Sequence, residues 1–350
     1  MTQSTSATEP ASPDLPGVDL PALTAWLDAE RPGLRQGELS GEVIAGGKSN
    51  LTYRMTDGTT TWALRRPPLA HVLPTAHDMV REFRVISALE PTAVPVAHPV
   101  ALCSDPDVLG APFYLMSFVD GVVLDRPKAL AALTPETARS TCEQLMDTLV
   151  TLHEIDPATV GLSDFGKADG FLERQVRRWH QQWQASETEP RAVLAEAIDR
   201  LTSTMPTQSA PGIVHGDYRL TNVMYRPDLS EIAAVVDWEM STLGDPLTDV
   251  GLLVVYQTLS ANADLVMPRM SPDDGWFTAE EMVARYAAGS SRDLSDLDWY
   301  VGFGYFKLAV VAEGIHHRFL QGKTVGDGFA HFGPAVPALL AAAVSALAQR

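Results

Sequence analysis

Cysteine is nearly absent from this chain, which excludes two classes of protein. Cys103 and Cys142 are the only cysteines among 350 residues. Two cysteines are too few for a disulfide framework or for a zinc site built from thiolates. Such a sequence is typical of a reducing compartment, and we expect the protein to be cytoplasmic.

Basic residues are scarce beside acidic ones. The chain has 26 Lys and Arg against 44 Asp and Glu, a net charge of -18. A surface of this charge repels nucleic acid and anionic membranes, and we find no local basic patch that would reverse the effect. It could attract a cationic ligand, although acidity also simply keeps proteins in solution. We therefore expect neither a nucleic-acid partner nor a membrane partner, and the sequence predicts no particular oligomeric state.

Long apolar runs and targeting segments are also missing. Residues 1–17 are rich in Ser, Thr, Pro and Ala and contain no Lys or Arg, unlike a secretory signal, so we expect a disordered leader there. The most apolar late stretch, 335–348, contains Pro337 and is too short to cross a bilayer. We predict that it forms a buried terminal helix.

Hydrophobic spacing divides the remaining chain into two lobes. Short strands with turn signals run from Gly41 to Arg65, and helical spacing dominates after residue 134. We predict a small lobe over 18–119 and a larger, mainly helical lobe over 120–350. Within the larger lobe, one apolar helix is expected to begin at Leu252.

The chemistry-bearing stretch lies in the second lobe. Asp217 ends a short apolar segment, Asn222 follows five residues later, and Asp237 ends the next apolar segment. Phosphoryl transfer needs a carboxylate that accepts the hydroxyl proton and hard oxygen ligands for Mg²⁺. We predict Asp217 as the proton acceptor, with Asn222 and Asp237 as metal ligands. His215 lacks a second histidine at zinc-ligand spacing, and we expect it to steady the loop.

Two features of the first lobe fit a phosphate-binding role only weakly by themselves. A glycine-rich turn over 46–50 lies between two expected strands, but it fails as a P-loop because position 42 is Glu. Arg65 ends a strand, and Glu82 lies on the next expected helix. The two side chains could form an ion pair that holds the cation over phosphates, or they could be two surface charges.

Taken together, the motifs of the second lobe resemble those of the aminoglycoside phosphotransferase-like kinases. This resemblance implies an α+β, two-lobed protein-kinase-like fold, with a small antiparallel-sheet N-lobe and a larger helical C-lobe. It also implies ATP and Mg²⁺ as cofactors. The motifs that carry it are His215-Gly216-Asp217 with Asn222, Asp237-Trp238-Glu239, and Gly244-Asp245-Pro246 with Asp249.

The same resemblance implies a nucleotide site built from the first lobe. The glycine-rich turn would cover the phosphates, Arg65 would take the place of the ATP-contacting lysine, and Glu82 would be its helix partner. Arg in place of Lys keeps the charge but is bulkier, which leaves the choice between ATP and GTP open. The residues implied for the phosphates and for the hinge against adenine are Gly46, Gly47, Ser49, Asn50, Met116, Phe118 and Val119.

The acceptor is less well defined than the base. We predict acceptor contacts from Tyr218, Arg219, Glu239, His316 and Arg318. The cations in this set favour an acidic acceptor, and the chain looks most like the subgroup that includes the kinase portion of acyl-CoA dehydrogenase fusion proteins. The prediction is a small-molecule kinase that phosphorylates a metabolic hydroxy compound such as a hydroxy acid. An aminoglycoside or other antibiotic O-phosphotransferase is the alternative, and a non-catalytic kinase-fold binding module is a third interpretation.

Overall fold

The chain folds into two compact units. The computed structural model describes residues 15–44, 50–69, 77–261, 269–324 and 328–348, and all structural statements below concern these residues. Unit 1 comprises Met1–Pro91 and Val96–Val119, and unit 2 comprises Thr92–Pro95 and Asp120–Arg350. Most of the predicted leader, residues 1–14, lies outside the described residues.

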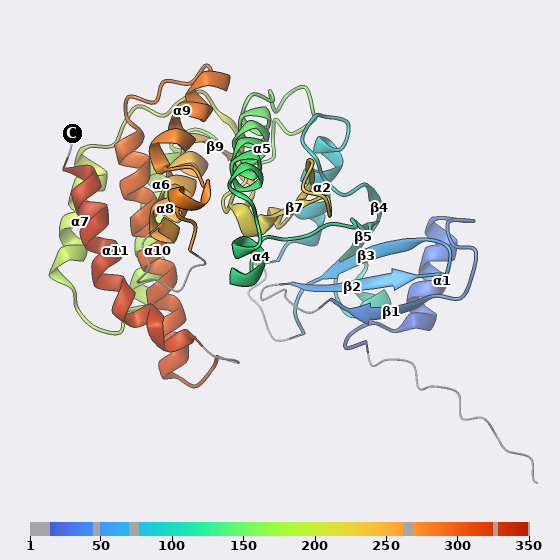
Figure 1. Cartoon of the computed structure of the whole chain (residues 1–350). Helices are drawn as coiled ribbons and strands as arrows, with labels where there is room; N and C mark the ends of the chain where they lie inside the picture. Colours follow the sequence, from blue (N-terminus) through green and yellow to red (C-terminus); the bar gives the residue numbers. More distant parts are fainter. Residues whose placement is uncertain (1–14, 45–49, 70–76, 262–268, 325–327, 349–350) are drawn as a thin grey trace, which may run out of the picture. The chain divides into compact units, whose positions relative to one another are not determined.

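Unit 1 is built on one five-stranded antiparallel sheet (Figure 1). The tight connection between the second and third strands is made by Asp57, whose carboxylate accepts hydrogen bonds from the backbone N–H groups of Thr59 and Thr60 at 2.8 and 2.6 Å. Gly58 adopts a φ of 86°, which favours glycine. In spatial order the strands are β1 (Ser40–Val43), β2 (Leu51–Thr56), β3 (Thr61–Arg66), β5 (Phe113–Ser117) and β4 (Pro99–Cys103).

Three helices accompany this sheet, and each begins with an Asp N-cap. Asp19 caps α1 (Leu20–Glu30) and Asp78 caps α2 (Met79–Leu89), each accepting from a backbone N–H three residues later. The third helix, α3, spans Pro106–Leu109. Helix α2 packs against β4 and β5, so Glu82 on its inner face is only 2% exposed.

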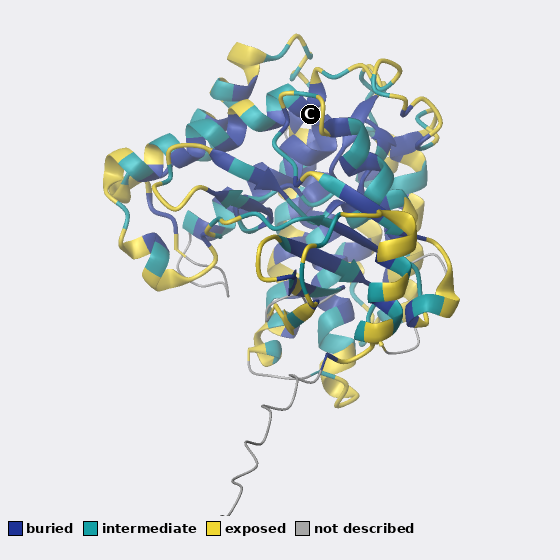
Figure 2. Cartoon of the chain, turned by 90° about the vertical axis from the view of Figure 1, so that its right-hand side faces the viewer, coloured by how far each residue is buried: buried dark blue, intermediate teal, exposed yellow. Residues whose placement is uncertain are grey.

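Unit 2 is mainly helical, and its core surrounds one long helix. Helix α10 (Leu297–Leu320) packs against α6, α8 and α11 (Figure 1), and most of its residues between Leu297 and Gly314 are buried. Figure 2 colours the described residues by their burial. The remaining helices include α9, which opens with a capping box between Thr278 and Glu281. The bounds are α4 (Pro127–Ala131), α5 (Pro135–His153), α6 (Phe171–Ser186), α7 (Ala192–Ser203), α8 (Leu247–Ala261), α9 (Ala279–Gly289) and α11 (Phe332–Leu347).

Two short antiparallel strand pairs position the motif-bearing loops. Strand β6 (Gly212–Val214) pairs with β9 (Thr242–Gly244), and β7 (Val223–Tyr225) pairs with β8 (Ile232–Val235). The backbone N–H of Val236, just after β8, donates to the carbonyl of Asn222 at 2.9 Å. The segment before Asp237 is therefore joined to the segment that carries Asn222.

Helix α8 begins five residues earlier than we predicted. Its first residue is Leu247, not Leu252. The carboxylate of Asp245 accepts from the backbone N–H of Leu247 at 3.1 Å, and the Asp245 carbonyl accepts from that of Thr248 at the same distance. Asp245 thus satisfies N–H groups that a helix start leaves unpaired, a signal that apolar spacing alone does not contain. The early start places Asp249 in the first turn.

The terminal helix packs along one face. The apolar helical segment is longer than the sequence prediction of 335–348, and the statement that it is too short to cross a bilayer is wrong by length and composition alone, since residues 329–347 pass that test, as a core helix can. Helix α11 lies against α7 and α10 and buries Val336, Leu340, Ala343 and Leu347, whereas Ala338 and other small residues are exposed. The prediction of a buried terminal helix is confirmed for this face.

Candidate active site

The Asp217 carboxylate is held from two sides and remains partly open to solvent. Its Oδ1 accepts a hydrogen bond from the Tyr256 hydroxyl at 2.8 Å, and its Oδ2 accepts one from the Asn222 amide at 3.0 Å. The Arg219 Nε lies 3.3 Å from Oδ2 in an ion pair, and 21% of the Asp217 side chain is exposed. This arrangement gives a carboxylate of fixed orientation that a small molecule can reach.

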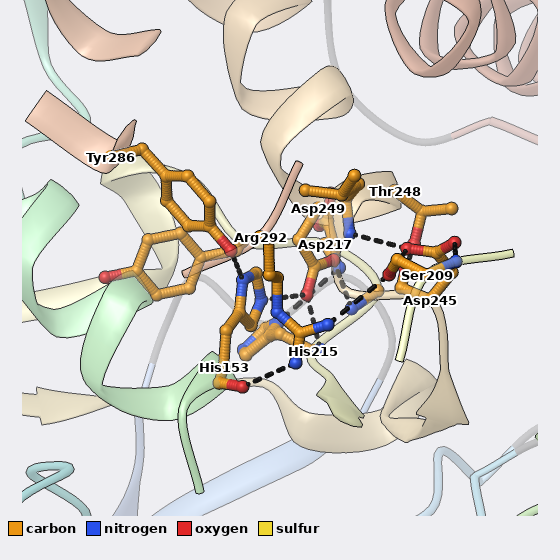
Figure 3. A network of polar contacts seen from close by, with 12 residues as sticks. His153, Ser209, His215, Asp217, Asp245, Thr248, Asp249, Tyr286 and Arg292 are labelled. Carbon is orange, nitrogen blue, oxygen red and sulfur yellow. Dashed lines mark hydrogen bonds and ion pairs between the residues drawn. The ribbon is translucent and has the colours of Figure 1, made fainter. Parts of the chain in front are cut away.

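A buried carboxylate fixes the backbone of the same loop (Figure 3). Asp249, which is 1% exposed, accepts hydrogen bonds from the N–H groups of His215 at 2.7 Å and Gly216 at 2.8 Å. Burial would raise the pKa of Asp249, but its contacts with His153 and His215 lower it overall, so it stays ionised. Gly216 has a φ of 88°, and a Cβ there would lie 2.7 Å from the Met240 carbonyl oxygen.

His215 is structural, as the sequence predicted. Its ring is fully buried, its Nδ1 accepts from the Asp217 N–H at 3.3 Å, and its Nε2 lies 3.0 Å from the Val236 carbonyl. Because Nδ1 accepts, the ring proton belongs on Nε2, where it donates to that carbonyl. His215 thereby links the loop of Asp217 to the segment just before Asp237.

Lys307 is a site neighbour that the sequence prediction missed. It lies midway along α10, and its Nζ donates to the Gly216 carbonyl at 2.5 Å while sitting 5.2 Å from the centre of the Trp179 ring. Burial lowers the pKa of Lys307, and the nearby Asp217 and Asp249 carboxylates oppose this shift. The signal in the sequence is one lysine within a long apolar helix.

A second buried histidine, His153, contacts the Asp249 carboxylate (Figure 3). The His153 Nε2 lies 3.4 Å from Asp249 Oδ2, and its Nδ1 lies 2.8 Å from the Tyr286 hydroxyl. Burial lowers the pKa of His153. Arg292 donates to the His153 backbone carbonyl at 2.8 Å, which secures the end of α5.

The Asp245 carboxylate ties the start of α8 to two other segments. It accepts from the Ser209 hydroxyl at 2.6 Å and from the Tyr300 hydroxyl on α10 at 2.7 Å. Asp245 is fully buried, and its carboxylate is hydrogen-bonded to side chains of this chain. The Gly-Asp-Pro motif therefore shapes the helix start that presents Asp249.

The two predicted metal ligands offer suitable donor atoms. The Asn222 amide nitrogen donates to Asp217, so its oxygen Oδ1 is the atom left for a cation. Asp237 adopts a left-handed conformation, with φ 68° and ψ 57°, two residues after the end of β8. One amide oxygen and one carboxylate are hard donors that fit Mg²⁺, which usually keeps water and phosphate as its other ligands. The described residues include no group of three His, Cys, Asp or Glu side chains that could hold a metal without such help.

Unit 1 contains the predicted ion pair. The Arg65 Nε lies 3.0 Å from Glu82 Oε1, with the two side chains 13% and 2% exposed. The pairing is therefore confirmed, and the alternative of two surface charges is wrong. Asn50 is buried at the start of the described residues after the glycine-rich turn. Gly46, Gly47 and Ser49 lie outside the described residues.

The predicted hinge residues follow one another at the end of β5. Met116 is in the strand, and Phe118 and Val119 come just after it, all three partly buried. The backbone N–H of Phe118 donates to the Thr61 carbonyl at 3.3 Å. Their contact with adenine stays a prediction.

One predicted acceptor residue is wrong. Tyr218 is fully buried, and its hydroxyl donates to the Leu145 carbonyl on α5 at 2.8 Å. Tyr218 thus enters the core, whereas the side chains of Asp217 and Arg219 stay partly exposed. Tyr218 therefore anchors the loop and does not face a ligand.

The other predicted acceptor residues occupy different places. Arg219 and the partly buried Glu239 belong to the two motif loops. His316 packs near Phe319 and Gly333, and Arg318 is exposed. His316 follows Lys307 by nine positions, about 13 Å along the helix axis. The described contacts of Asp217 involve neither His316 nor Arg318, and their role stays a prediction.

An apolar pocket lies beside the Asp217 side chain. Arg219 and Tyr256, the two residues that contact its carboxylate from this side, both line it. Arg219 is the one charged residue among the described residues that form the wall. Much of that wall is made by Leu124, Leu145, Leu253, Met270, Trp276 and Met282.

Comparison with known proteins identifies the family. The sequence model of the "Phosphotransferase enzyme family" matches residues 40–296. The chain belongs to this family. It is also similar to mouse acyl-CoA dehydrogenase family member 10, with 32% identity over 281 residues, which are 79% of this chain and 26% of that protein. The chain thus spans about a quarter of that relative's length.

Solved structures of phosphotransferases share the fold of this family member. A putative aminoglycoside phosphotransferase from Ralstonia eutropha has a TM-score of 0.83 and 30% identity, with 95% of this chain and 98% of that chain covered. A thermostable mutant of aminoglycoside phosphotransferase APH(4)-Ia, in complex with AMP-PNP and hygromycin B, has a TM-score of 0.58 and 13% identity, covering 93% and 98%. The predicted α+β kinase-like fold, with an antiparallel N-terminal sheet and a helical C-terminal portion, is confirmed.

Acidification should destabilise the protein through His153. Burial holds the pKa of His153 below about 6.5, the ordinary value for histidine, so the folded state disfavours the protonated ring. The contribution of the neutral His153 ring to the free energy of unfolding is fully present above about pH 6.5. It is lost as the pH falls through the pKa of His153 in the folded protein. We expect the free energy of unfolding of the native protein, relative to His153→Gln, to decrease between about pH 8 and 5 in urea titrations. His331→Gln, at an exposed position, is the control, and an unchanged difference for His153→Gln would contradict the assignment.

Proposed function

We propose that this family member is an ATP- and Mg²⁺-dependent small-molecule kinase that phosphorylates the hydroxyl of a metabolic compound such as a hydroxy acid. Family membership supports the reaction class. The observation that carries the rest is the Asp217 carboxylate, oriented by Tyr256 and Asn222 and partly exposed. A positioned carboxylate of this kind suits the acceptance of a proton from an attacking hydroxyl.

Other residues around Asp217 would bind the metal ion and supply a positive charge to the ligand. Asn222 and Asp237 would hold Mg²⁺, which neutralises phosphate charge when bound. Arg219 remains cationic: burial would lower its pKa, but the charges of Asp217 and Asp237 and the nearby Tyr256 raise it overall. A fixed cation beside the base is suited to an anionic ligand.

The nucleotide would be bound by residues of unit 1. Arg65, held by its ion pair with Glu82, would contact the phosphates, and the turn over 46–50 would cover them. The buried carboxylate of Glu82 keeps the guanidinium in one orientation, which lowers the entropic cost of binding an anion. The AMP-PNP bound to the APH(4)-Ia mutant supports ATP as the nucleotide.

The pocket beside Asp217 favours a hydroxy acid over an aminoglycoside. Aminoglycosides are polycations, and a site for them needs several carboxylates. The described residues of this pocket include no Asp or Glu, and its charged member is Arg219. The cavity is small, about 40 Å³, so it would take only part of an acceptor. Its apolar wall with one cation would suit a short hydrocarbon portion next to an anionic group. The aminoglycoside alternative rests on the similarity to the putative aminoglycoside phosphotransferase and on the net charge of -18.

Removal of the base tests the reaction class. Asp217→Asn keeps the size of the side chain but loses the proton-accepting charge. We expect ADP release with Mg-ATP and an accepted hydroxy compound to fall by at least about 10²-fold. Asp228→Asn, in the exposed turn between β7 and β8, should keep the native rate. Turnover retained by Asp217→Asn would show that this carboxylate is not the base, and Mg-dependent nucleotide binding by a native protein without turnover would favour the binding module.

A panel of acceptors tests the substrate class. The native protein should release ADP with one or more hydroxy acids and stay at the rate without acceptor when given aminoglycosides, because the pocket lacks carboxylates for polycations. Mass spectrometry of the acceptor should show one added phosphoryl group. Phosphorylation of the aminoglycosides alone would reverse the choice of acceptor.

A further inference from the structure

The contacts of Asp217 leave one of its oxygens better placed than the other to accept a proton. A carboxylate oxygen offers two in-plane lone pairs. Around Oδ2 lie the Asn222 amide at 3.0 Å and the Arg219 guanidinium at 3.3 Å. Among the residues that the structure describes, only the Tyr256 hydroxyl contacts Oδ1, at 2.8 Å. Oδ1 therefore keeps its second lone pair for an incoming hydroxyl.

Tyr256 is built to remain a hydrogen-bond donor. It lies within α8 and is 9% exposed, and the guanidinium of Arg219 sits 5.3 Å from the centre of its ring. Burial, and then the nearby Asp217 carboxylate, raise the pKa of Tyr256 far above its ordinary value. Its hydroxyl therefore keeps its own proton and donates it to Oδ1.

Tyr256 also faces the apolar pocket. Its neighbour on the same helix face, Leu253, is 3% exposed and lines the same wall. A small molecule in this pocket thus contacts the residue that orients the base. Tyr256 thus lines the pocket and also determines which lone pair of Oδ1 is left free.

We propose that Tyr256 is a positioning residue that fixes the Asp217 carboxylate and directs the acceptor hydroxyl to Oδ1 from the pocket lined by Tyr256 and Leu253. This rests on the proposed function. The acceptor O–H bond breaks and its proton moves to Oδ1, while the acceptor oxygen bonds to the γ-phosphorus of ATP. The bond from that phosphorus to the bridging oxygen breaks, ADP leaves, and Tyr256 keeps its proton.

Loss of the hydroxyl should affect transfer more than nucleotide binding. Tyr256→Phe keeps the ring beside Arg219 but frees Asp217 to rotate. We expect kcat for transfer to the acceptor to fall at least about tenfold, the typical weight of a hydrogen bond to a charged group, with the KM for Mg-ATP unchanged. Because a rotating Asp217 can also activate water, ADP release should exceed acceptor phosphorylation by a larger ratio than in the native protein.

A second tyrosine provides the matched control. Tyr225→Phe removes a buried hydroxyl that donates to the Thr141 carbonyl at 3.0 Å, away from Asp217. It should keep the native ratio of ADP to phosphorylated acceptor.

Leu253→Phe narrows the pocket and should raise the KM for the acceptor without changing that for Mg-ATP. A Tyr256→Phe protein with the native kcat and the native ratio of ADP released to acceptor phosphorylated would overturn the proposal.

A structural measurement separates this proposal from the proposed function. If the native protein turned over no acceptor, the proposed function would fail, but the orientation claim could still be decided by crystal structures of the native protein and Tyr256→Phe. An Asp217 side chain that turns to another rotamer in the variant supports the positioning role. An Asp217 that stays in place overturns it.

Discussion

The candidate site depends on one buried anion, the Asp249 carboxylate, and on its hydrogen bonds to the backbone of His215 and Gly216. These two N–H groups precede Asp217 directly, so their direction sets the path of the loop that presents the base. Asp249 lies in the first turn of α8, where the helix dipole favours negative charge. A carboxylate between two backbone donors and His153 is satisfied without solvent, which allows complete burial.

Helix α8 connects the loop anchor to the base itself. Asp249 and Tyr256 are seven residues apart, so they lie on the same helix face about 10 Å from each other along the axis. The first residue holds the loop backbone and the second donates to the Asp217 carboxylate. From α10, Lys307 fixes the Gly216 carbonyl. Two packed helices thus define the orientation of one side chain, as a preorganised site requires.

The sequence predicted the parts of the site that are local in the chain. Asp217, Asn222 and Asp237 were found from their spacing, and the ion pair between Arg65 and Glu82 was considered because a strand and the next helix are close in sequence. Caps such as Asp19, Asp78 and the Thr278 box could also be predicted, since each acts within about one helical turn.

Longer-range contacts could not be predicted in this way. Lys307 meets Gly216 across 91 positions, and His153 meets Asp249 across 96. Neither contact has a local pattern, because the packing of α5, α8 and α10 creates both. Tyr218 was misassigned for the same reason: its neighbours face the site, but the position of α5 draws its hydroxyl into the core. The predicted first residue of α8 is wrong because apolar spacing does not reveal the cap at Asp245.

The most direct test of this account is the turnover of Asp249→Asn. The amide keeps the shape of the carboxylate but directs an NH₂ group at one of the two backbone donors, so one hydrogen bond is lost and the loop must shift. We predict that kcat for ADP release in the presence of Mg-ATP and acceptor falls at least about 10²-fold, in a protein that still unfolds cooperatively. A folded Asp249→Asn protein with native kcat would contradict the claim that this carboxylate positions the catalytic loop.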